Sequence, residues 1–408
     1  MQATLNQELE EFRAELRSWI ESNTPPGLAE LFDWNNSMTR RGQEGVSAAK
    51  ASPLYKEWES RLLEAHLICA HWPVEYGGRG LSAAKLSIVG EEFYRAGVPV
   101  INRVMGELLV GPSIIVHGTD EQKAYFLPRI IDGTDVYCQG FSEPNHGSDL
   151  AAVETKGVID GDEVIVTGQK VWTSQDANAT NMMFCLCRTD ESQPRHRGLS
   201  YVLLPFRNNG IEVRPIRQMT GGSHFCEEFI DGARAPLFNI IGGLGNGWRV
   251  AMTTLGDERG GSVTVMQSPY AKEFWDLVDV VRKSGRDKDP FVRQQLAWTY
   301  ENVEIQRVAG LELKAAQTQG RSPGPGILVS KLRSTEYHKK FAQMAMAIVG
   351  PESLIRPPGE GYDIDSWQDI FLRTPAQTIA GGSSQIQRNI ISERALGMPK
   401  EPSASTSR

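Results

Sequence analysis

The nine residues FSEPNHGSD, positions 141–149, separate two parts of the chain that have different hydrophobic patterns. On their N-terminal side, apolar residues recur every three or four positions at 5, 9, 12, 16 and 19, which predicts an amphipathic helix. Further helical patterns cover 55–71 and 83–96, and this zone ends near Gly133. The hydroxyls and backbone donors of 141–149 could hold a polar heterocycle or a carbonyl oxygen, although a plain turn would need no ligand.

From about Tyr137 onward the pattern changes to short β-rich runs bounded by Gly, Asp, Asn or Pro. These predicted strands cover 163–167, 182–187, 199–204 and 211–216. They indicate a β-domain of about one hundred residues. Long helical patterns then return at 248–267, 290–319 and 332–349, with lengths typical of an antiparallel bundle. The sequence therefore predicts a mostly α protein with a central β-domain. A Rossmann fold is disfavoured, because GLGNG at 243–247 lacks both the third glycine spacing and a preceding strand.

Length and composition agree with a globular protein of two or three domains. The 408 residues are 40% hydrophobic and 23% charged, with a net charge of -7. This acidic balance argues against nucleic acid as a partner, and no stretch is long and apolar enough for a membrane span. The N-terminus does not resemble a signal peptide, so we expect a cytoplasmic location.

The five cysteines are odd in number and scattered, which predicts reduced, mostly buried thiols. Cys185 and Cys187 lie in an apolar run that is typical of a core strand, and no second Cys/His pair is suitably spaced nearby. We therefore expect no metal site.

One carboxylate interrupts the apolar face of the helix predicted at 248–267. The inward positions of that helix are 251, 255, 258, 262 and 265, and position 258 is a glutamate. A buried carboxylate costs free energy unless it is paired or functional, and an apolar setting raises its pKa toward the range of a general base. The alternative is a solvated residue or one paired with Arg259. Gly256, Gly260 and Gly261 weaken this helix and suit a close approach to a ligand or another helix.

Another candidate segment is GQKVWTS at 168–174, where a large aromatic residue and small hydroxyls are adjacent at a predicted strand end. Taken alone, Trp172 fits a core anchor better than a platform for a cofactor.

Several motifs, in this order, resemble the acyl-CoA dehydrogenase family of flavoproteins over essentially the whole chain. WPVEYGG at 72–78 and HGTDEQK at 117–123, with Leu127 and Pro128, look like two of its N-terminal motifs. SEP through GSD at 142–149 and GQKVWTS at 168–174 look like its flavin-contacting signatures, and GSSQIQR at 382–388 looks like its C-terminal motif. Together these matches are far more specific than any one of them.

The resemblance implies an N-terminal helical domain at 1–134, a middle β-barrel or sandwich domain at 135–240, a C-terminal four-helix bundle at 241–400 and a flexible tail at 401–408. It implies FAD as cofactor, an acyl-CoA as substrate and electron-transferring flavoprotein as electron acceptor. The residues that it assigns to the cofactor are Phe141, Ser142, Trp172, Thr173, Ser174, Ser383 and Gln385. Ser148 and Arg259 are assigned to the substrate.

The resemblance also implies the catalytic base. Family members carry their catalytic glutamate at one of two positions, and the commoner one corresponds here to Gly381. The other lies in an L-x-x-E-R context, which LGDER at 255–259 matches. Glu258 is therefore predicted to remove the α-proton of an acyl thioester while a hydride leaves the β-carbon for flavin N5.

Two alternatives remain open at this stage. One is a flavin oxidase or monooxygenase on the same fold, and the other is a non-catalytic partner subunit. The family segments that complete a neighbouring subunit's FAD site have drifted at 286–293 and 346–351, which resembles actinobacterial hetero-oligomeric members. Dimers or tetramers of identical or unlike chains therefore both stay possible, and the acyl group could be branched, long-chain, aromatic or a steroid side chain.

Overall fold

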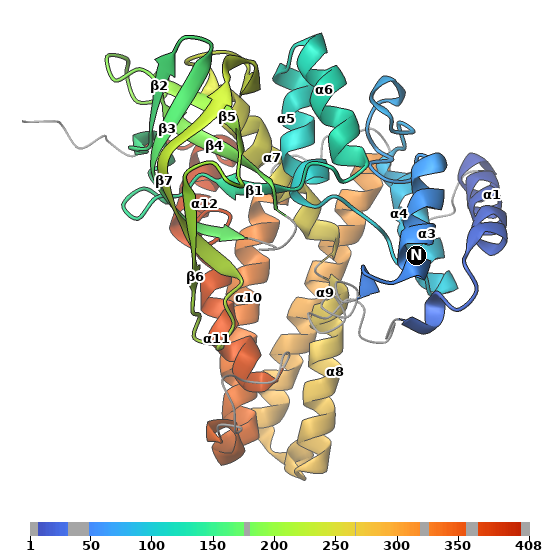
Figure 1. Cartoon of the computed structure of the whole chain (residues 1–408). Coiled ribbons are helices and arrows are strands. Elements are labelled where there is room, and N and C mark those ends of the chain that lie inside the picture. Colours follow the sequence, from blue (N-terminus) through green and yellow to red (C-terminus); the bar gives the residue numbers. More distant parts are fainter. Residues whose placement is uncertain are drawn as a thin grey trace, which may run out of the picture. The chain divides into compact units, whose positions relative to one another are not determined.

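A computed structural model of the chain describes residues 7–31, 49–174, 180–265, 267–318, 326–355 and 366–400. Within the helices, it does not describe the side chains of 257–265, 267–269, 314, 317–318 and 327–328. The chain forms two compact units, Met1–Glu258 and Arg259–Arg408 (Figure 1). The predicted domain boundaries after 134 and 240 stay predictions.

The first unit begins with helices that bury one apolar face each. They are α1 (Gln7–Asn23), α3 (Pro53–Glu64), α4 (Ala83–Ala96), α5 (Gly111–His117) and α6 (Asp120–Ile131), with a π-helical turn at Gly106–Val110. The helix predicted at 83–96 is confirmed. The one predicted at 55–71 is wrong beyond Glu64, because His66 and Cys69 adopt positive φ angles of 51° and 52° that a right-handed helix does not allow.

The β part of this unit is one eight-stranded sheet in the order β6-β7-β3-β2-β4-β5-β8, with β1 paired in parallel to β4. Most of the other neighbours are antiparallel. The strands are β1 (Tyr137–Gly140), β2 (Lys156–Asp160), β3 (Glu163–Ser174), β4 (Met182–Arg188), β5 (Leu199–Pro205), β6 (Ile211–Ile216), β7 (Phe225–Pro236) and β8 (Ile240–Ile241).

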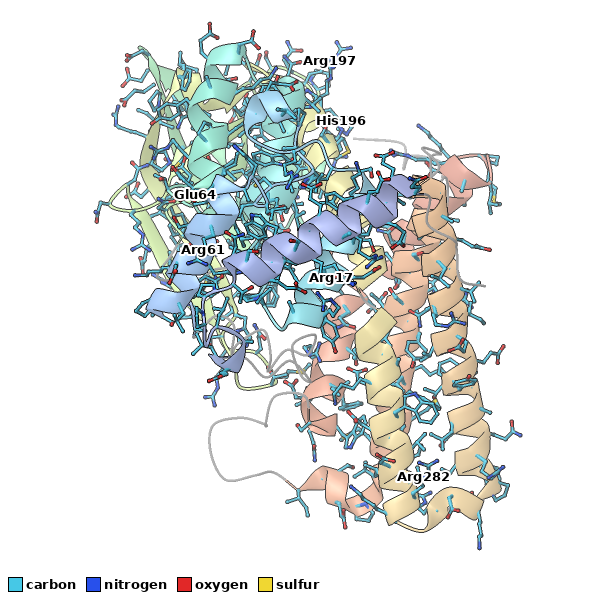
Figure 2. The ribbon with its side chains drawn as sticks, turned by 90° about the vertical axis from the view of Figure 1, so that its right-hand side faces the viewer. Arg17, Arg61, Glu64, His196, Arg197 and Arg282 are labelled. Carbon is cyan, nitrogen blue, oxygen red and sulfur yellow. The ribbon has the colours of Figure 1, made fainter. Side chains whose placement is uncertain are left out.

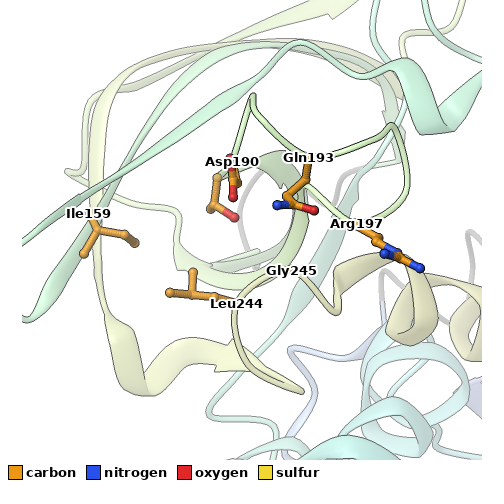
Figure 3. A pocket seen from close by; sticks show the side chains of 7 residues that line it. Ile159, Asp190, Gln193, Arg197, Leu244 and Gly245 are labelled. Atoms are coloured by element: carbon orange, nitrogen blue, oxygen red, sulfur yellow. The ribbon is translucent and has the colours of Figure 1, made fainter.

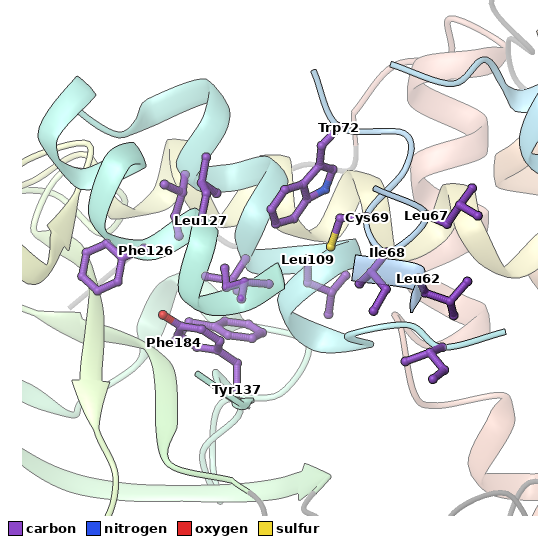
Figure 4. Close-up of a cluster of buried hydrophobic side chains, with 14 of the residues drawn as sticks. Leu62, Leu67, Ile68, Cys69, Trp72, Leu109, Phe126, Leu127, Tyr137 and Phe184 are labelled. Atoms are coloured by element: carbon purple, nitrogen blue, oxygen red, sulfur yellow. The ribbon is translucent and has the colours of Figure 1, made fainter. Parts of the chain in front are cut away.

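Strand β4 shows how the sheet joins the helices into one core. Its residues alternate between two apolar clusters, as the two faces of a strand require. Phe184 and Leu186 belong to the cluster that contains Trp72, Leu109 and Leu127 from the N-terminal part of the unit, part of which Figure 4 shows. Its other face, which includes Cys185 and Cys187, packs within the β-domain. Burial on both faces explains why this run is apolar throughout.

Two differences from the predicted strands affect the site, and one predicted helix has a different start. Strand β3 does not stop at 167 but continues to Ser174, through register shifts at Val166/Gly168 and Val171/Thr173. Strand β7, its antiparallel partner, was not predicted, because Glu227, Glu228 and Asp231 break the apolar pattern. The helix predicted at 332–349 begins earlier, at Gly326.

Helices α7 (Gly247–Val265), α8 (Gln267–Lys283), α9 (Pro290–Thr318), α10 (Gly326–Val349), α11 (Trp367–Gln377) and α12 (Ser384–Ile390) follow the sheet. The division between the two units falls within α7. In the second unit, Phe274, Leu277, Tyr337, Phe341 and Ile348 form the centre of a separate apolar cluster. This arrangement agrees with the predicted mostly α fold with a central β-domain.

All five cysteines are free and buried, as their scatter predicted. Within the described ranges, no group of three or more His, Cys, Asp or Glu side chains is arranged to hold a metal ion. Nor does any helix there combine the length and apolar character that crossing a bilayer requires.

A buried carboxylate holds α1 against α4. Glu92, only 2% exposed, accepts hydrogen bonds from three arginines, two of them on α1. These are Arg13 (2.9 Å), Arg17 (2.9 Å to each carboxylate oxygen) and Arg95 (2.7 Å). Figure 2 labels Arg17 on α1. The hydrogen bond from Arg17, ahead of those from Arg95 and Arg13, lowers the pKa of Glu92 to about 2.

We expect Glu92→Gln to lower the free energy of unfolding at pH 7 by about 2 kcal/mol, since hydrogen bonds to charged groups are worth about 1.5–3 kcal/mol. The folded pKa is depressed, so this stabilisation is present above the unfolded value of about 4.5 and is lost as the pH falls toward 2. Denaturant unfolding across this range should therefore show the two proteins converging in acid. Glu91→Gln, next in the chain but exposed, should change stability by less than about 1 kcal/mol; an equal loss in both variants would contradict this role.

Candidate active site

The segment 141–143 and the second half of β3 form one structure. The backbone N–H of Val171 on β3 donates to the carbonyl of Ser142 over 2.9 Å, which joins the segment after β1 to β3. Phe141 is buried, with its ring edge-on to Phe184 and Tyr201, and Ser142 is half-buried. The structure thus brings together four residues that the resemblance assigns to the flavin, namely Phe141, Ser142, Trp172 and Thr173.

A buried ion pair between Lys170 and Glu143 holds the segment 141–143 against β3. The ammonium group of Lys170, which is 0% exposed, donates to Glu143 (2.9 Å) and to the carbonyls of Phe141 (3.2 Å) and Leu186 (2.7 Å). Its three protons are therefore all used. Glu143 also accepts hydrogen bonds from the backbone N–H groups of Glu154 (2.7 Å) and Thr155 (2.9 Å). Burial opposes its ionisation, but Lys170 and these N–H groups outweigh burial and lower its pKa.

Trp172 is exposed and has a strained backbone. Its φ is 65°, in the left-handed region that costs a non-glycine residue about 1–3 kcal/mol and is concentrated at functional sites. The side chain is 59% exposed and lies edge-on to Phe225, with 6.4 Å between ring centroids. The reading of Trp172 as a core anchor is therefore wrong. The register shift at Val171/Thr173 turns the indole out of the sheet instead.

The residues around Trp172 differ in exposure. Thr173 is buried, and its hydroxyl donates to the carboxylate of Glu228 over 2.7 Å. Ser174 is exposed at the end of β3, and Ser148 is exposed in the loop after β1. Thr173 therefore fixes the strand from inside, while the two serines are accessible to a ligand.

The strain at Trp172 gives a test of its role. We expect Trp172→Gly to change the free energy of unfolding of the flavin-free chain by less than about 1 kcal/mol, because relief of the left-handed conformation offsets the entropy cost of glycine and the side chain buries little surface. Retention of flavin should fall in the same variant. Denaturant unfolding and the flavin-to-protein absorbance ratio measure the two effects; unchanged flavin retention would show that the indole has no part in binding.

Position 258 lies on the same face of helix α7 as a row of buried residues. Gly247, Ala251 and Thr254 are buried along one side of the helix. Position 258 follows Thr254 by four residues and Ala251 by seven, which continues this face at the helical period. The side chains of Glu258 and Arg259 lie outside those that the structure describes.

In the second unit, the two predicted cofactor residues lie at the start of α12. The Ser383 hydroxyl caps the helix by accepting from the N–H of Ile386 over 3.3 Å, and Gln385 is exposed. Sequence reasoning missed their neighbours Ser384 and Gln387. In the described part of the chain, Ser384 Oγ and Gln387 Oε1 are buried without a hydrogen-bond partner, so both could bond to a polar ligand. Both residues lie within GSSQIQR at 382–388, and the resemblance of this segment to a family motif was the signal that could have identified them.

A cavity of about 340 Å³ lies in the first unit (Figure 3). Its lining combines polar and apolar side chains and comes from the ends of strands and the loop before α7. The lining residues are Ile159, Thr189, Asp190, Gln193, Arg197, Leu244 and Gly245. None of them was predicted as a site residue.

Comparison with known proteins agrees with this architecture. The models for the N-terminal, middle and C-terminal domains of acyl-CoA dehydrogenase match residues 6–134, 138–230 and 245–396. The acyl-CoA dehydrogenase IpdE1 of Mycobacterium tuberculosis is 41% identical over 97% of this chain and 99% of its own length. IpdE1 of Mycolicibacterium smegmatis is 40% identical over the same shares.

Two solved structures with similar folds contain pairs of named chains. The Tcur3481-Tcur3483 steroid ACAD matches with a TM-score of 0.75 and 29% identity, over 98% of this chain and 100% of that one. The ChsE4-ChsE5 complex from Mycobacterium tuberculosis matches with a TM-score of 0.73 and 27% identity, over the same shares. With matched models across all three of its parts and a full-length relative at 41% identity, the chain belongs to the acyl-CoA dehydrogenase family.

Proposed function

We propose that this chain catalyses the FAD-dependent α,β-dehydrogenation of an acyl-CoA thioester, with Glu258 as the base that removes the α-proton. The observation that carries the proposal is Trp172, an exposed indole in a strained conformation beside a segment fixed by the buried Glu143–Lys170 pair. Such strain persists where the surrounding structure enforces it and is typical of ligand sites.

The residues present fit the cofactor. Phe141, Ser142, Trp172, Thr173 and Ser174 would hold the flavin end through the fixed backbone and the exposed indole. In the second unit, Ser383 and Gln385 would bind FAD beside the two buried polar groups that lack partners, Ser384 Oγ and Gln387 Oε1. FAD, when bound, supplies the acceptor for the hydride that leaves the β-carbon of the substrate.

Glu258 would act on the substrate from α7. Its position continues the buried face of that helix at the helical period, and a positioned carboxylate can serve as a general base. Ser148 and Arg259 would contact the thioester substrate. Gly381, at the other position where the family carries its base, has a φ of 63° and no side chain to offer.

The relatives point to a substrate class and to a partner. We infer an acyl group derived from a steroid, because the Tcur3481-Tcur3483 relative is described as a steroid ACAD. We also infer an unlike partner subunit, because that structure and the ChsE4-ChsE5 complex each name two chains. Electron-transferring flavoprotein would reoxidise the flavin, and the enzyme would work in the cytoplasm.

The test uses tagged protein purified from its native cells, so that any unlike subunit is retained. We expect the visible spectrum of an oxidised flavin, and anaerobic bleaching on addition of a steroid-derived acyl-CoA but little with a short straight-chain acyl-CoA. Bleaching by the straight-chain compound alone would overturn the substrate class. A flavin that no acyl-CoA bleaches, or no flavin at all, would overturn the reaction. Rapid reoxidation by oxygen would favour an oxidase or monooxygenase instead.

The partner inference has its own measurement. The chain expressed alone should hold clearly less than one FAD per chain, and the native complex should contain a second polypeptide. One FAD per chain in protein expressed alone would contradict an unlike partner that completes the site.

A further inference from the structure

A chain of buried hydroxyl groups lies one helical turn before Glu258. The side chains of Thr254 on α7, Ser113 on α5 and Tyr201 on β5 are each 0% exposed. Oγ1 of Thr254 lies 2.7 Å from Oγ of Ser113 and 3.3 Å from the hydroxyl of Tyr201. Three elements that are far apart in the sequence therefore meet at one threonine.

The protons of these hydroxyls can be ordered without conflict. Tyr201 donates to Thr254, and Ser113 donates to the carbonyl of Leu109 over 3.0 Å. Thr254 donates to Ser113, which at 2.7 Å is a closer acceptor than the carbonyl of Val250 at 3.3 Å. Burial raises the pKa of Tyr201, which keeps its phenol protonated as the first donor. Leu109 lies in the π-helical turn Gly106–Val110, a backbone feature frequent at functional sites.

A second hydrogen bond joins the same two helices. Nε2 of His117 lies 2.8 Å from the hydroxyl of Thr253, next to Thr254. On α5, Ser113 and His117 are four residues apart and so face the same side. Burial, followed by the nearby Arg249, lowers the pKa of His117 and favours its neutral form. Together the two contacts fix both the rotation of α7 about its axis and its position along that axis.

The helix beyond this anchor is intrinsically weak. Gly256, Gly260 and Gly261 flank Glu258, and each costs a helix about 1 kcal/mol relative to alanine. The segment around 258 therefore contributes little to its own positioning. Proton abstraction needs the base within a fraction of an ångström of its productive position, since a displacement of about 1 Å costs about 10²-fold in rate.

We propose that the Tyr201–Thr254–Ser113 hydroxyl chain is a positioning device for Glu258, with Thr254 as its central positioning residue. This inference rests on the proposed function, in which Glu258 is the base. Thr254 touches neither substrate nor cofactor in this role; it sets the place of the carboxylate one turn further along α7.

The test compares Thr254→Val, which keeps the shape and removes the hydroxyl, with Thr254→Ser, which keeps the hydroxyl. The holoenzyme is mixed with acyl-CoA in deuterated water, and mass spectrometry follows exchange of the α-proton alongside flavin bleaching. Thr254→Val should slow both by about 10–100-fold, with the dissociation constant of the acyl-CoA and the flavin content within about twofold. Thr254→Ser should stay within about threefold of the wild type.

A matched control is Thr299→Val on α9. Thr299 is also 0% exposed, and its hydroxyl donates to the carbonyl of Gln295 over 2.9 Å. This variant should leave both rates unchanged, although it removes the same group from a buried helix face. If Thr254→Val does not fold, Ser113→Ala decides, with the same slowing expected.

Three outcomes separate the two proposals. If Glu258→Gln leaves α-proton exchange intact, the proposed function fails. If Glu258→Gln stops exchange while Thr254→Val and Ser113→Ala do not slow it, the positioning role fails and the base stands. A variant that only lowers the melting temperature and flavin content, with an unchanged rate per bound flavin, also overturns the positioning role.

Discussion

Glu258→Gln should reduce the rate of anaerobic flavin bleaching by acyl-CoA about 10³-fold or more, while acyl-CoA binding stays within a few-fold. Glutamine has nearly the same shape as glutamate but cannot accept the α-proton, and a positioned general base contributes about 10²–10⁴-fold. The variant should lower the rate but hardly change the affinity, because the lost interaction is made in the transition state and not in the bound substrate. Stopped-flow absorbance and equilibrium titration measure the two quantities.

Two variants make this result specific. Asp257→Asn removes a carboxylate from the preceding position, which lies about 100° around the helix, and should change the rate by less than about threefold. Glu258→Asp keeps the carboxylate but withdraws it by one methylene, and should cost about 10–10²-fold. Equal losses in Asp257→Asn and Glu258→Gln would point to an effect of net charge. An unaffected Glu258→Gln would remove Glu258 from the mechanism.

Local patterns of apolar residues predicted helices that bury one face and a strand that is buried on both faces. The helix at 83–96 is found at the predicted residues because its pattern coincides with a Ser82 cap at one end and Gly97 at the other. Strand β4 was predicted because burial on both faces makes its run uniformly apolar. The prediction that the helix at 55–71 reaches His71 is wrong because Leu67 and Ile68 lie in a non-helical turn and are buried there. Apolar spacing alone does not distinguish a helix from such a turn.

The candidate site was predictable from the family motifs but not from the local spacing of apolar residues. Lys170 and Glu143 are 27 residues apart, so no local rule pairs them. A lysine at an inward position of a strand was the one available signal. The exposure of Trp172 depends on a register shift between β3 and β7, and β7 itself was missed because it carries buried Glu228. The contact between Ser113 and Thr254 spans 141 residues and appears only when the helices are packed.

Lys170→Met should lower the free energy of unfolding at pH 7 by about 3–5 kcal/mol, because breaking a buried ion pair leaves an uncompensated charge. Glu143, with its side chain 6% exposed, would keep its two backbone donors but lose the ammonium. The folded pKa of Glu143 lies below 4.5, so the pair stabilises the wild type above that pH and less as the pH falls. In the variant, protonation of Glu143 at low pH removes the uncompensated buried charge. The difference between the two proteins should therefore narrow below about pH 4.5, as measured by urea unfolding.

The same substitution in an exposed pair is the control. Lys156 lies 2.8 Å from Glu191, both more than half exposed, so Lys156→Met should cost no more than about 1 kcal/mol. Adding Glu143→Gln to Lys170→Met should recover part of the loss, because the second change removes the stranded charge. Flavin retention should not recover in the double variant, since the Phe141 carbonyl still lacks the ammonium group that holds the segment 141–143 in place beside β3. Full recovery of flavin there would mean that the pair serves stability alone, and that Ser142 and Trp172 are positioned by the strands themselves.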